Sequence, residues 1–102
     1  MERKIVHVHK GEIYYCERND EIIIVEDGGW CNTYGNSAPT IIIEDGGRCS
    51  TRDNSTPIVT VEDEGWCSTW GNSAPVVIIK DGGYCDTWDN STPTVINRTA
   101  GA

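Results

Sequence analysis

The chain has 102 residues, a formal net charge of −8 and an isoelectric point near 4.5. This length limits it to one domain. Nucleic acid and anionic membrane surfaces are excluded as expected partners because an acidic surface repels phosphates, and no apolar run is long enough to form a membrane-spanning helix.

The first 25 residues are an irregular copy of a unit that repeats later in the chain. The opening MERKIVHVHK lacks the apolar core of a signal peptide, so a cytoplasmic or virion-associated location is expected rather than secretion. When one residue is skipped near Glu21, Gly11 aligns with Gly28, and Cys16 falls where later copies have threonine. An outermost repeat that departs from the pattern is typical of a cap, because it has one neighbour and faces water. We therefore expect residues 1–25 to form a degenerate capping repeat.

Four copies of an 18-residue unit follow without insertion or deletion. The first reads EDGGWCNTYGNSAPTIII, and every copy keeps Asp, Gly, Cys, Thr, Asn-Ser and Pro at the same offsets. The copies are residues 26–43, 44–61, 62–79 and 80–97, and a tail of residues 98–102 follows. A fixed period of this length predicts stacked units rather than a central globular core.

A weaker period of 36 residues lies over the first, because Gly35 and Gly71 alternate with Asp53 and Asp89. Duplication of a two-copy ancestor explains this alternation. The alternative is a functional difference between successive copies along the stack.

Each copy predicts two short β-strands and no helix. Segments such as TIII at residues 40–43 are β-branched and lie between Asn-Ser-Pro and Asp-Gly turn signals. Segments such as WCNT at residues 30–33 alternate strictly, so Cys31 and Thr33 share one face while Trp30 lies on the other.

Two all-β architectures fit these strands. In a β-solenoid (parallel β-helix) of about five coils, each copy is one coil and equivalent side chains stack in rows about 4.8 Å apart. In an antiparallel hairpin-repeat meander or barrel, Asp-Gly is instead a hairpin turn. Stacked carboxylates oppose the solenoid by about 0.9 kcal/mol per pair at the dielectric of water, whereas the constant repeat length and the small Cys and Thr side chains favour it. We predict the solenoid with an N-terminal cap and keep the meander as the alternative.

Four of the five cysteines form one row. Their spacing matches neither the irregular pairing of disulfide scaffolds nor the close pairs of zinc sites. We expect reduced, buried cysteines that serve as small apolar residues; the alternative is cross-linking of stacked neighbours in an oxidising compartment. A threonine row shares the same face. The two structural rows are Cys31, Cys49, Cys67, Cys85 and Thr33, Thr51, Thr69, Thr87.

Two rows of aromatic residues and arginine are expected on the opposite, outer face. Both arginines fall in one copy, between aromatic neighbours, which favours cation–π stacking worth about 0.5–1 kcal/mol. The rows either stabilise the array itself or form an interface or binding surface, in which Trp, Tyr and Arg are typical anchors. They consist of Trp30, Arg48, Trp66, Tyr84 and of Tyr34, Arg52, Trp70, Trp88.

Functional expectations follow from these rows. No separate set of nucleophile, base and acid is visible, so we expect a non-enzymatic protein without a cofactor. An outward row of Ile42, Thr60, Ile78 and Ile96 predicts association between copies of the chain, and an uncapped strand edge at the C-terminal end would recruit further strands. The prediction is a self-associating structural module (a scaffold, fibre or spike component) that forms a homo-oligomer or filament.

Two other functions remain as alternatives. One is a binding module whose aromatic rows recognise carbohydrate or protein. The other is ice binding, which requires the threonine row to point outward.

Metal binding has a small set of candidate ligands. Asp before Gly is ordinary turn chemistry, and no copy shows the dense ligand spacing of a calcium loop. Two histidines alternate on one strand and could hold a metal across a symmetric oligomer. The candidates are His7, His9, Asp27, Asp45, Asp63 and Asp81.

Overall fold

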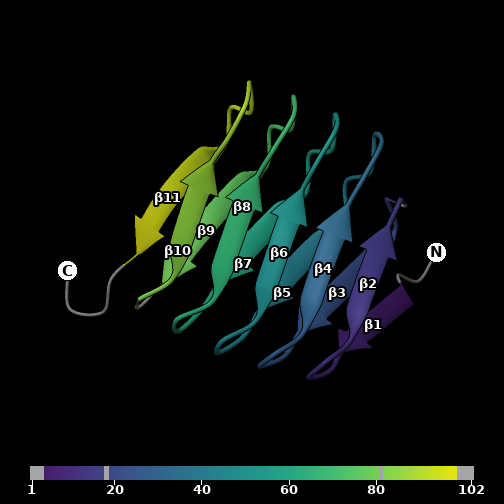
Figure 1. Ribbon diagram of the computed structural model, residues 1–102, viewed down its shortest axis with the longest axis vertical. Helices are drawn as coiled ribbons and strands as arrows, with labels where there is room; N and C mark the ends of the chain where they lie inside the picture. The colour runs from purple at the N-terminus through teal and green to yellow at the C-terminus, as the bar shows by residue number, and fades with distance from the viewer. Residues whose placement is uncertain (1–3, 18, 81, 99–102) are drawn as a thin grey trace.

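The computed structural model describes residues 4–17, 19–80 and 82–98. In these ranges the chain forms eleven strands in two sheets (Figure 1), and no helix is long and apolar enough to cross a membrane. The first sheet, here called the Ile sheet, has the order β1 (Lys4–Val8), β3 (Glu21–Val25), β5 (Thr40–Ile43), β7 (Ile58–Val61), β9 (Val76–Lys80) and β11 (Thr94–Arg98). The second, here called the Cys sheet, has the order β2 (Ile13–Cys16), β4 (Trp30–Thr33), β6 (Arg48–Thr51), β8 (Trp66–Thr69) and β10 (Tyr84–Thr87).

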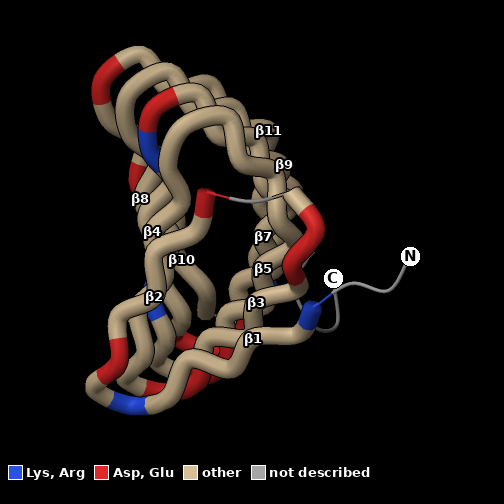
Figure 2. The backbone as a smooth tube through the Cα atoms, turned by 90° about the vertical axis from the view of Figure 1, so that its right-hand side faces the viewer, with Lys and Arg blue, Asp and Glu red and all other residues tan. Residues whose placement is uncertain are grey.

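Every neighbouring pair of strands is parallel. The chain alternates between the two sheets, and Figure 2 shows the resulting stack of coils. Trp30 lies opposite Arg48, and Arg48 lies opposite Trp66. The predicted β-solenoid of about five 18-residue coils is therefore confirmed. The antiparallel meander is wrong, because the Asp-Gly turn joins strands of opposite sheets rather than hydrogen-bonded neighbours.

The N-terminal copy continues both sheets in register. Cys16 lies opposite Thr33, a separation of 17 residues, whereas Ile22 lies opposite Thr40, a separation of 18. The skipped residue therefore falls between Cys16 and Ile22. The predicted tail is partly strand, since β11 extends to Arg98, and its remaining residues lie outside the described ranges.

The interior of the first coil contains a hydrogen-bonded pair that later coils lack. Tyr14 lies in the position of Cys31, and its hydroxyl donates to the Glu21 carboxylate, 2.7 and 2.9 Å from the two oxygens. Glu21 is only 1% exposed, and Lys4 Nζ lies 4.0 Å from it. Burial and the hydrogen bond to Glu21 raise the pKa of Tyr14. This pair satisfies its own polar groups inside the first coil.

The rest of the interior pairs a row of large side chains with a row of small ones. Ile41 and Ile43 of the Ile sheet and Cys31 and Thr33 of the Cys sheet are all fully buried. Three threonines of the row also hydrogen-bond to a buried serine in the loop of the next coil. These pairs are Thr33–Ser55, Thr51–Ser73 and Thr69–Ser91, at 2.9, 3.0 and 2.8 Å.

The glycine at the fourth position of each copy is required by the close approach of successive coils. A Cβ atom on Gly47 would lie 2.9 Å from the Val25 carbonyl oxygen and 3.0 Å from Ile43 Cγ2. A side chain there would push neighbouring coils apart.

The 36-residue alternation has a structural use. Gly35 and Asp53 both have positive φ, 61° and 56°, a region that Gly and Asp tolerate better than most residues. The Asp53 carboxylate accepts a hydrogen bond from the Gly35 backbone N–H at 3.0 Å, and Asp89 accepts one from Gly71 at 3.2 Å. Each repeat with Asp at this position therefore hydrogen-bonds to the preceding repeat, which has Gly there.

Candidate functional site

The outer face of the Cys sheet carries both aromatic rows. One row consists of the first residues of β4, β6, β8 and β10. The other row consists of the residues that directly follow the last residues of these four strands. Between the rows lies a third line of outward residues, made of Asn32, Ser50, Ser68 and Asp86.

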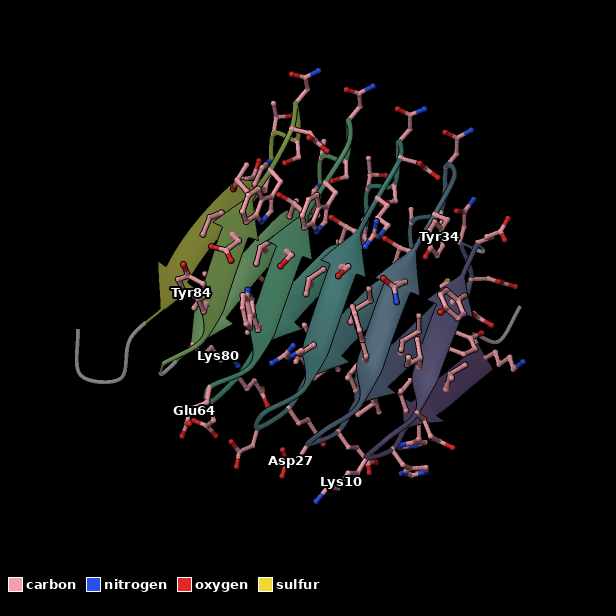
Figure 3. The ribbon with its side chains drawn as sticks, in the orientation of Figure 1. Lys10, Asp27, Tyr34, Glu64, Lys80 and Tyr84 are labelled. Carbon is pink, nitrogen blue, oxygen red and sulfur yellow. The ribbon has the colours of Figure 1, made fainter. Side chains whose placement is uncertain are left out.

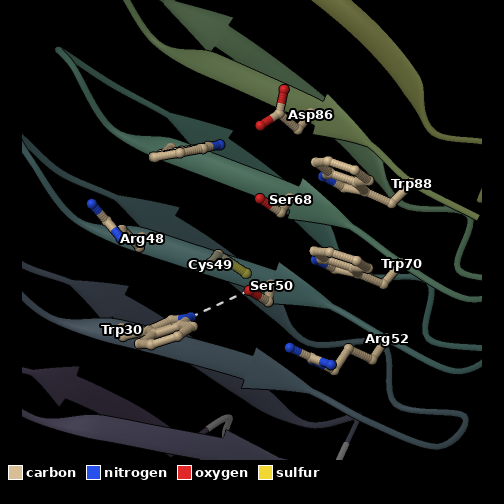
Figure 4. Close-up of a pocket in the computed structure, with 10 residues that line it drawn as sticks. Trp30, Arg48, Cys49, Ser50, Arg52, Ser68, Trp70, Asp86 and Trp88 are labelled. Carbon is tan, nitrogen blue, oxygen red and sulfur yellow. Dashed lines mark hydrogen bonds between the residues drawn. The ribbon is translucent and has the colours of Figure 1, made fainter.

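In the second aromatic row the ring faces are covered by their neighbours. Trp70 and Trp88 stack in parallel, with ring centroids 4.9 Å apart and an interplanar angle of 5°. The Arg52 guanidinium carbon lies 5.6 Å from the centroid of Trp70. Because Arg52 and Trp88 belong to the coils on either side of Trp70, both faces of the Trp70 ring are occupied (Figure 4).

The first aromatic row is built in the same way. The Arg48 guanidinium carbon lies 5.0 Å from the Trp66 centroid, and the Tyr84 ring meets Trp66 edge to face at 5.7 Å. Each such contact contributes about 0.5–1.5 kcal/mol to holding successive coils together. The rows therefore offer a partner mainly ring edges and N–H groups; the half-exposed Trp88 ends its row.

A groove of about 290 Å³ runs between the two rows (Figure 4). Ser50 and Ser68 form its floor, and the tryptophans and arginines form its walls. Trp30 Nε1 donates a hydrogen bond to Ser50 Oγ, one coil further along, at 3.3 Å. The groove thus combines apolar ring edges with hydroxyl groups and two cationic side chains.

Two N–H donors of this groove are buried without an acceptor: Trp66 Nε1 and Arg52 Nε. Ser50, the acceptor of Trp30, lies 20 residues after it in the chain. The residue at the same separation from Trp66 is Asp86. Its carboxylate instead hydrogen-bonds to Tyr84, which raises the pKa of the Tyr84 hydroxyl. A buried donor without a partner costs about 1–3 kcal/mol. The groove is therefore chemically suited to a ligand that supplies acceptor oxygens.

The cysteine row lies inside the solenoid. Cys31, Cys49 and Cys67 are in register and buried, whereas Cys85 is partly exposed on the outer strand β10. None of the five cysteines, all of which lie in the described ranges, forms a disulfide. Contacts with the thiols of Cys31 and Cys67, together with burial, raise the pKa of Cys49. These side chains serve packing rather than surface chemistry.

The threonine row is also internal. Thr33, Thr51 and Thr69 are 0% exposed, and only Thr87, in the last coil, is exposed. A buried hydroxyl cannot contact an ice surface, so the described structure contains no flat outward threonine face.

The two histidines both contact Glu26. His9 Nδ1 lies 2.8 Å from Glu26 Oε1, and His7 Nδ1 lies 3.3 Å from Oε2. This hydrogen bond raises the pKa of His9 and lowers that of Glu26. Within the described ranges no three His, Cys, Asp or Glu side chains are arranged to hold a metal ion. Asp81 lies outside these ranges.

The remaining aspartates lie on the turn that joins the Ile sheet to the Cys sheet. Asp27, Asp45 and Asp63 are exposed there, and Figure 3 shows Asp27 among these turns, at the lower side of the view. The glutamate row beside them is flanked by cationic groups, since Lys80 Nζ lies 3.8 Å from Glu62 at one end and the histidines hold Glu26 at the other. These contacts offset part of the repulsion that opposed a solenoid.

The outer face of the Ile sheet carries two rows of mostly apolar residues, which are here called the Ile face. It includes the predicted outward row and a parallel row that the sequence analysis did not single out. The strict alternation of these strands would have revealed the second row. The two rows are His7, Ile24, Ile42, Thr60, Ile78, Ile96 and Ile5, Ile22, Thr40, Ile58, Val76, Thr94.

The groove itself was not predicted, although its walls were. Its two unpaired donors depend on side-chain packing between coils, and the only sequence signal is that Asp86 replaces serine in the floor. Comparisons of this chain with family models, with curated proteins and with solved structures found no match.

Proposed function

We propose that this protein is a non-enzymatic structural module that assembles with copies of itself. The observation that carries the proposal is the Ile face. Its two rows contain isoleucine, valine, threonine and one histidine, and no acidic residue, although the chain has a net charge of −8. A mostly apolar face on an acidic protein is typical of an association surface, and a second such face can pack against it at about 10 Å.

The size of the Ile face favours an extended assembly over an isolated dimer. Six strands about 4.8 Å apart, each of which contributes two residues to the Ile face, present an area on the order of 300 Å². A stable protein interface buries about 800 Å² on each partner. One pair of Ile faces is therefore weak, whereas several Ile faces presented along one side of a filament bind cooperatively.

Light scattering after size-exclusion chromatography, over a concentration series, tests this proposal. We expect particles heavier than the 11.2 kDa monomer, and we expect Ile42→Lys and Ile78→Lys together to reduce their mass. Asn54→Lys and Asn72→Lys together, a change of equal charge at two exposed loop positions, are the matched control and should leave the mass unchanged. A strict monomer at about 1 mM, where even weak contacts of about 4 kcal/mol are populated, would contradict self-association.

The unpaired donors of the groove favour a second candidate function, which is binding of an acidic carbohydrate. Carboxylate and hydroxyl oxygens of a sugar chain would accept from Trp66 Nε1 and Arg52 Nε once the side chains that bury these two atoms move aside, and Arg48 adds positive charge. Tryptophan fluorescence during titration with uronic-acid oligosaccharides tests this function. Trp66→Phe should weaken binding more than Trp30→Phe, because the Trp30 N–H already has Ser50 as its partner. No response to any acidic oligosaccharide would rule it out.

A further inference from the structure

The most exposed large apolar side chains gather at the two ends of the stack. Among the described residues, three of them lie on β1 and β2 and four belong to the last coil; only Ile58 lies between. Such clustering is typical of surfaces that become covered. The three at the start are Ile5, Ile13 and Tyr15, and the four at the end are Tyr84, Trp88, Val95 and Ile96.

The same two ends carry open strand edges. In the described chain β1 and β11 are the outer strands of the Ile sheet, and β2 and β10 are the outer strands of the Cys sheet. Each has a hydrogen-bonded neighbour on one side only, so its other edge presents unpaired backbone N–H and C=O groups. A strand that runs parallel to β10 or β11 can continue the ladder.

The number of strands decides how a second copy fits. Six strands lie in the Ile sheet and five in the Cys sheet, so after β11 the next position along the solenoid is in the Cys sheet, beside β10. A second copy stacked without rotation would place its β1 beside β11 and leave the position beside β10 empty. A second copy turned by half a turn about the solenoid axis places its β1 beside β10. Strands on the two sides run in opposite directions (Figure 1), so the rotated β1 is parallel to β10.

We propose that copies of this chain stack end to end with a half-turn rotation, so that β1 pairs with β10 and β2 pairs with β11 of the preceding copy. This inference rests on the proposed self-association and specifies the contact that builds the filament. It commits to a second copy because both ends belong to one parallel architecture and match each other in side chains.

The outer side chains of the β1–β10 junction are complementary. When Val6 is placed beside Cys85, so that the interior residues of both strands face inward, Ile5 lies beside Tyr84; these two side chains are 58% and 54% exposed in the single chain. His7 then lies beside Asp86, a pair that can hydrogen-bond across the junction. In the unrotated arrangement His7 would lie beside Ile96 instead.

The β2–β11 junction covers the other exposed apolar groups. Tyr15 lies beside Ile96 on the outside, and Tyr14 covers Val95, which faces the interior yet is 41% exposed. Inside the first junction Val6 covers Cys85, and both already pack against the core cluster. The junction therefore continues the hydrophobic interior from one copy to the next.

Disulfide trapping distinguishes the two stacking modes. Neighbouring parallel strands are about 4.8 Å apart, within the range that a disulfide spans. The test uses a Cys85→Ser background, because Cys85 is the one native cysteine that is not buried. In this background, His7→Cys with Asp86→Cys should give a ladder of cross-linked species on non-reducing gels. The matched control, His7→Cys with Ile96→Cys, reports the unrotated contact and should not. A ladder from the control alone, or from neither variant when particles have formed, would overturn the inference.

Electron microscopy of the wild-type assembly provides a second readout. Half-turn stacking predicts a rise of five and a half coil spacings, about 26 Å per copy, whereas unrotated stacking needs about 29 Å and no rotation. Particles with any other repeat contradict the half-turn junction while leaving self-association intact. A chain that stays monomeric contradicts both.

Discussion

The hydroxyl of Thr51 donates a hydrogen bond to the Ser73 hydroxyl over 3.0 Å. Both residues are fully buried. Thr51 lies on β6 and Ser73 in the loop of the next coil, so the bond links two coils through the interior.

Removing this bond should destabilise the protein. Thr51→Val keeps the side-chain shape but leaves the Ser73 hydroxyl with only its bond to the Thr51 carbonyl oxygen, at 3.4 Å. We expect the free energy of unfolding to fall by about 1–3 kcal/mol. Ser73→Ala should have a similar effect, and the double variant should cost about 1 kcal/mol less than the sum of the two. Urea denaturation measures all three; strictly additive losses would show that the two hydroxyls do not interact.

One serine of the buried row lacks its threonine. Ser37 Oγ is buried without a hydrogen-bond partner, because Cys16 lies at the position that threonine occupies in later coils. Cys16→Thr should therefore raise the free energy of unfolding by about 1 kcal/mol. Cys49→Thr is the control, since it puts a hydroxyl among the buried cysteines and should lower stability. A Cys16→Thr protein no more stable than wild type would contradict this account.

The third repeat contains a strained turn. Glu64 has a φ of 48°, where the equivalent Gly28, Gly46 and Gly82 have φ between 75° and 84°. A side chain in this left-handed region costs about 1–2 kcal/mol, so Glu64→Gly should raise the melting temperature by about 2–5 °C after the entropy of glycine is subtracted. Glu64→Gln keeps the strain and removes the charge. If the Gln variant gains as much as the Gly variant, charge repulsion is the cause rather than backbone strain.

Stability should depend on pH through His9 and Glu26. Their hydrogen bond raises the pKa of His9 above its ordinary 6.5, so its contribution is complete below that value and is lost as the pH rises through the folded-state pKa. The pKa of Glu26 is lowered, so its contribution is lost as the pH falls below about 4.5. His7 also faces Glu26, and Glu12 faces His9.

Thermal melts between about pH 5.5 and about pH 8 measure the His9 effect. The melting temperature should fall toward the higher pH in the wild type, and His9→Gln should show a smaller fall. Equal pH dependence in both proteins would assign the effect to another group.

The sequence by itself determined the strands, the repeat length and the face on which Cys31 and Thr33 lie. A strand alternates its side chains with a period of two residues, and a constant repeat aligns equivalent residues wherever identical units stack. The offset of Cys16 onto the threonine row followed from the same rule. These inferences needed only local periodicity.

Only the tertiary structure decided between solenoid and meander, because Asp-Gly suits both a hairpin and a turn between opposite sheets. The choice depends on closing an apolar interior between two sheets, which is not a local property. Packing between coils likewise decided that the faces of Trp70 are covered while Trp66 Nε1 has no acceptor. Such outcomes depend on which atoms of adjacent coils meet, and the repeat pattern specifies rows rather than atomic contacts.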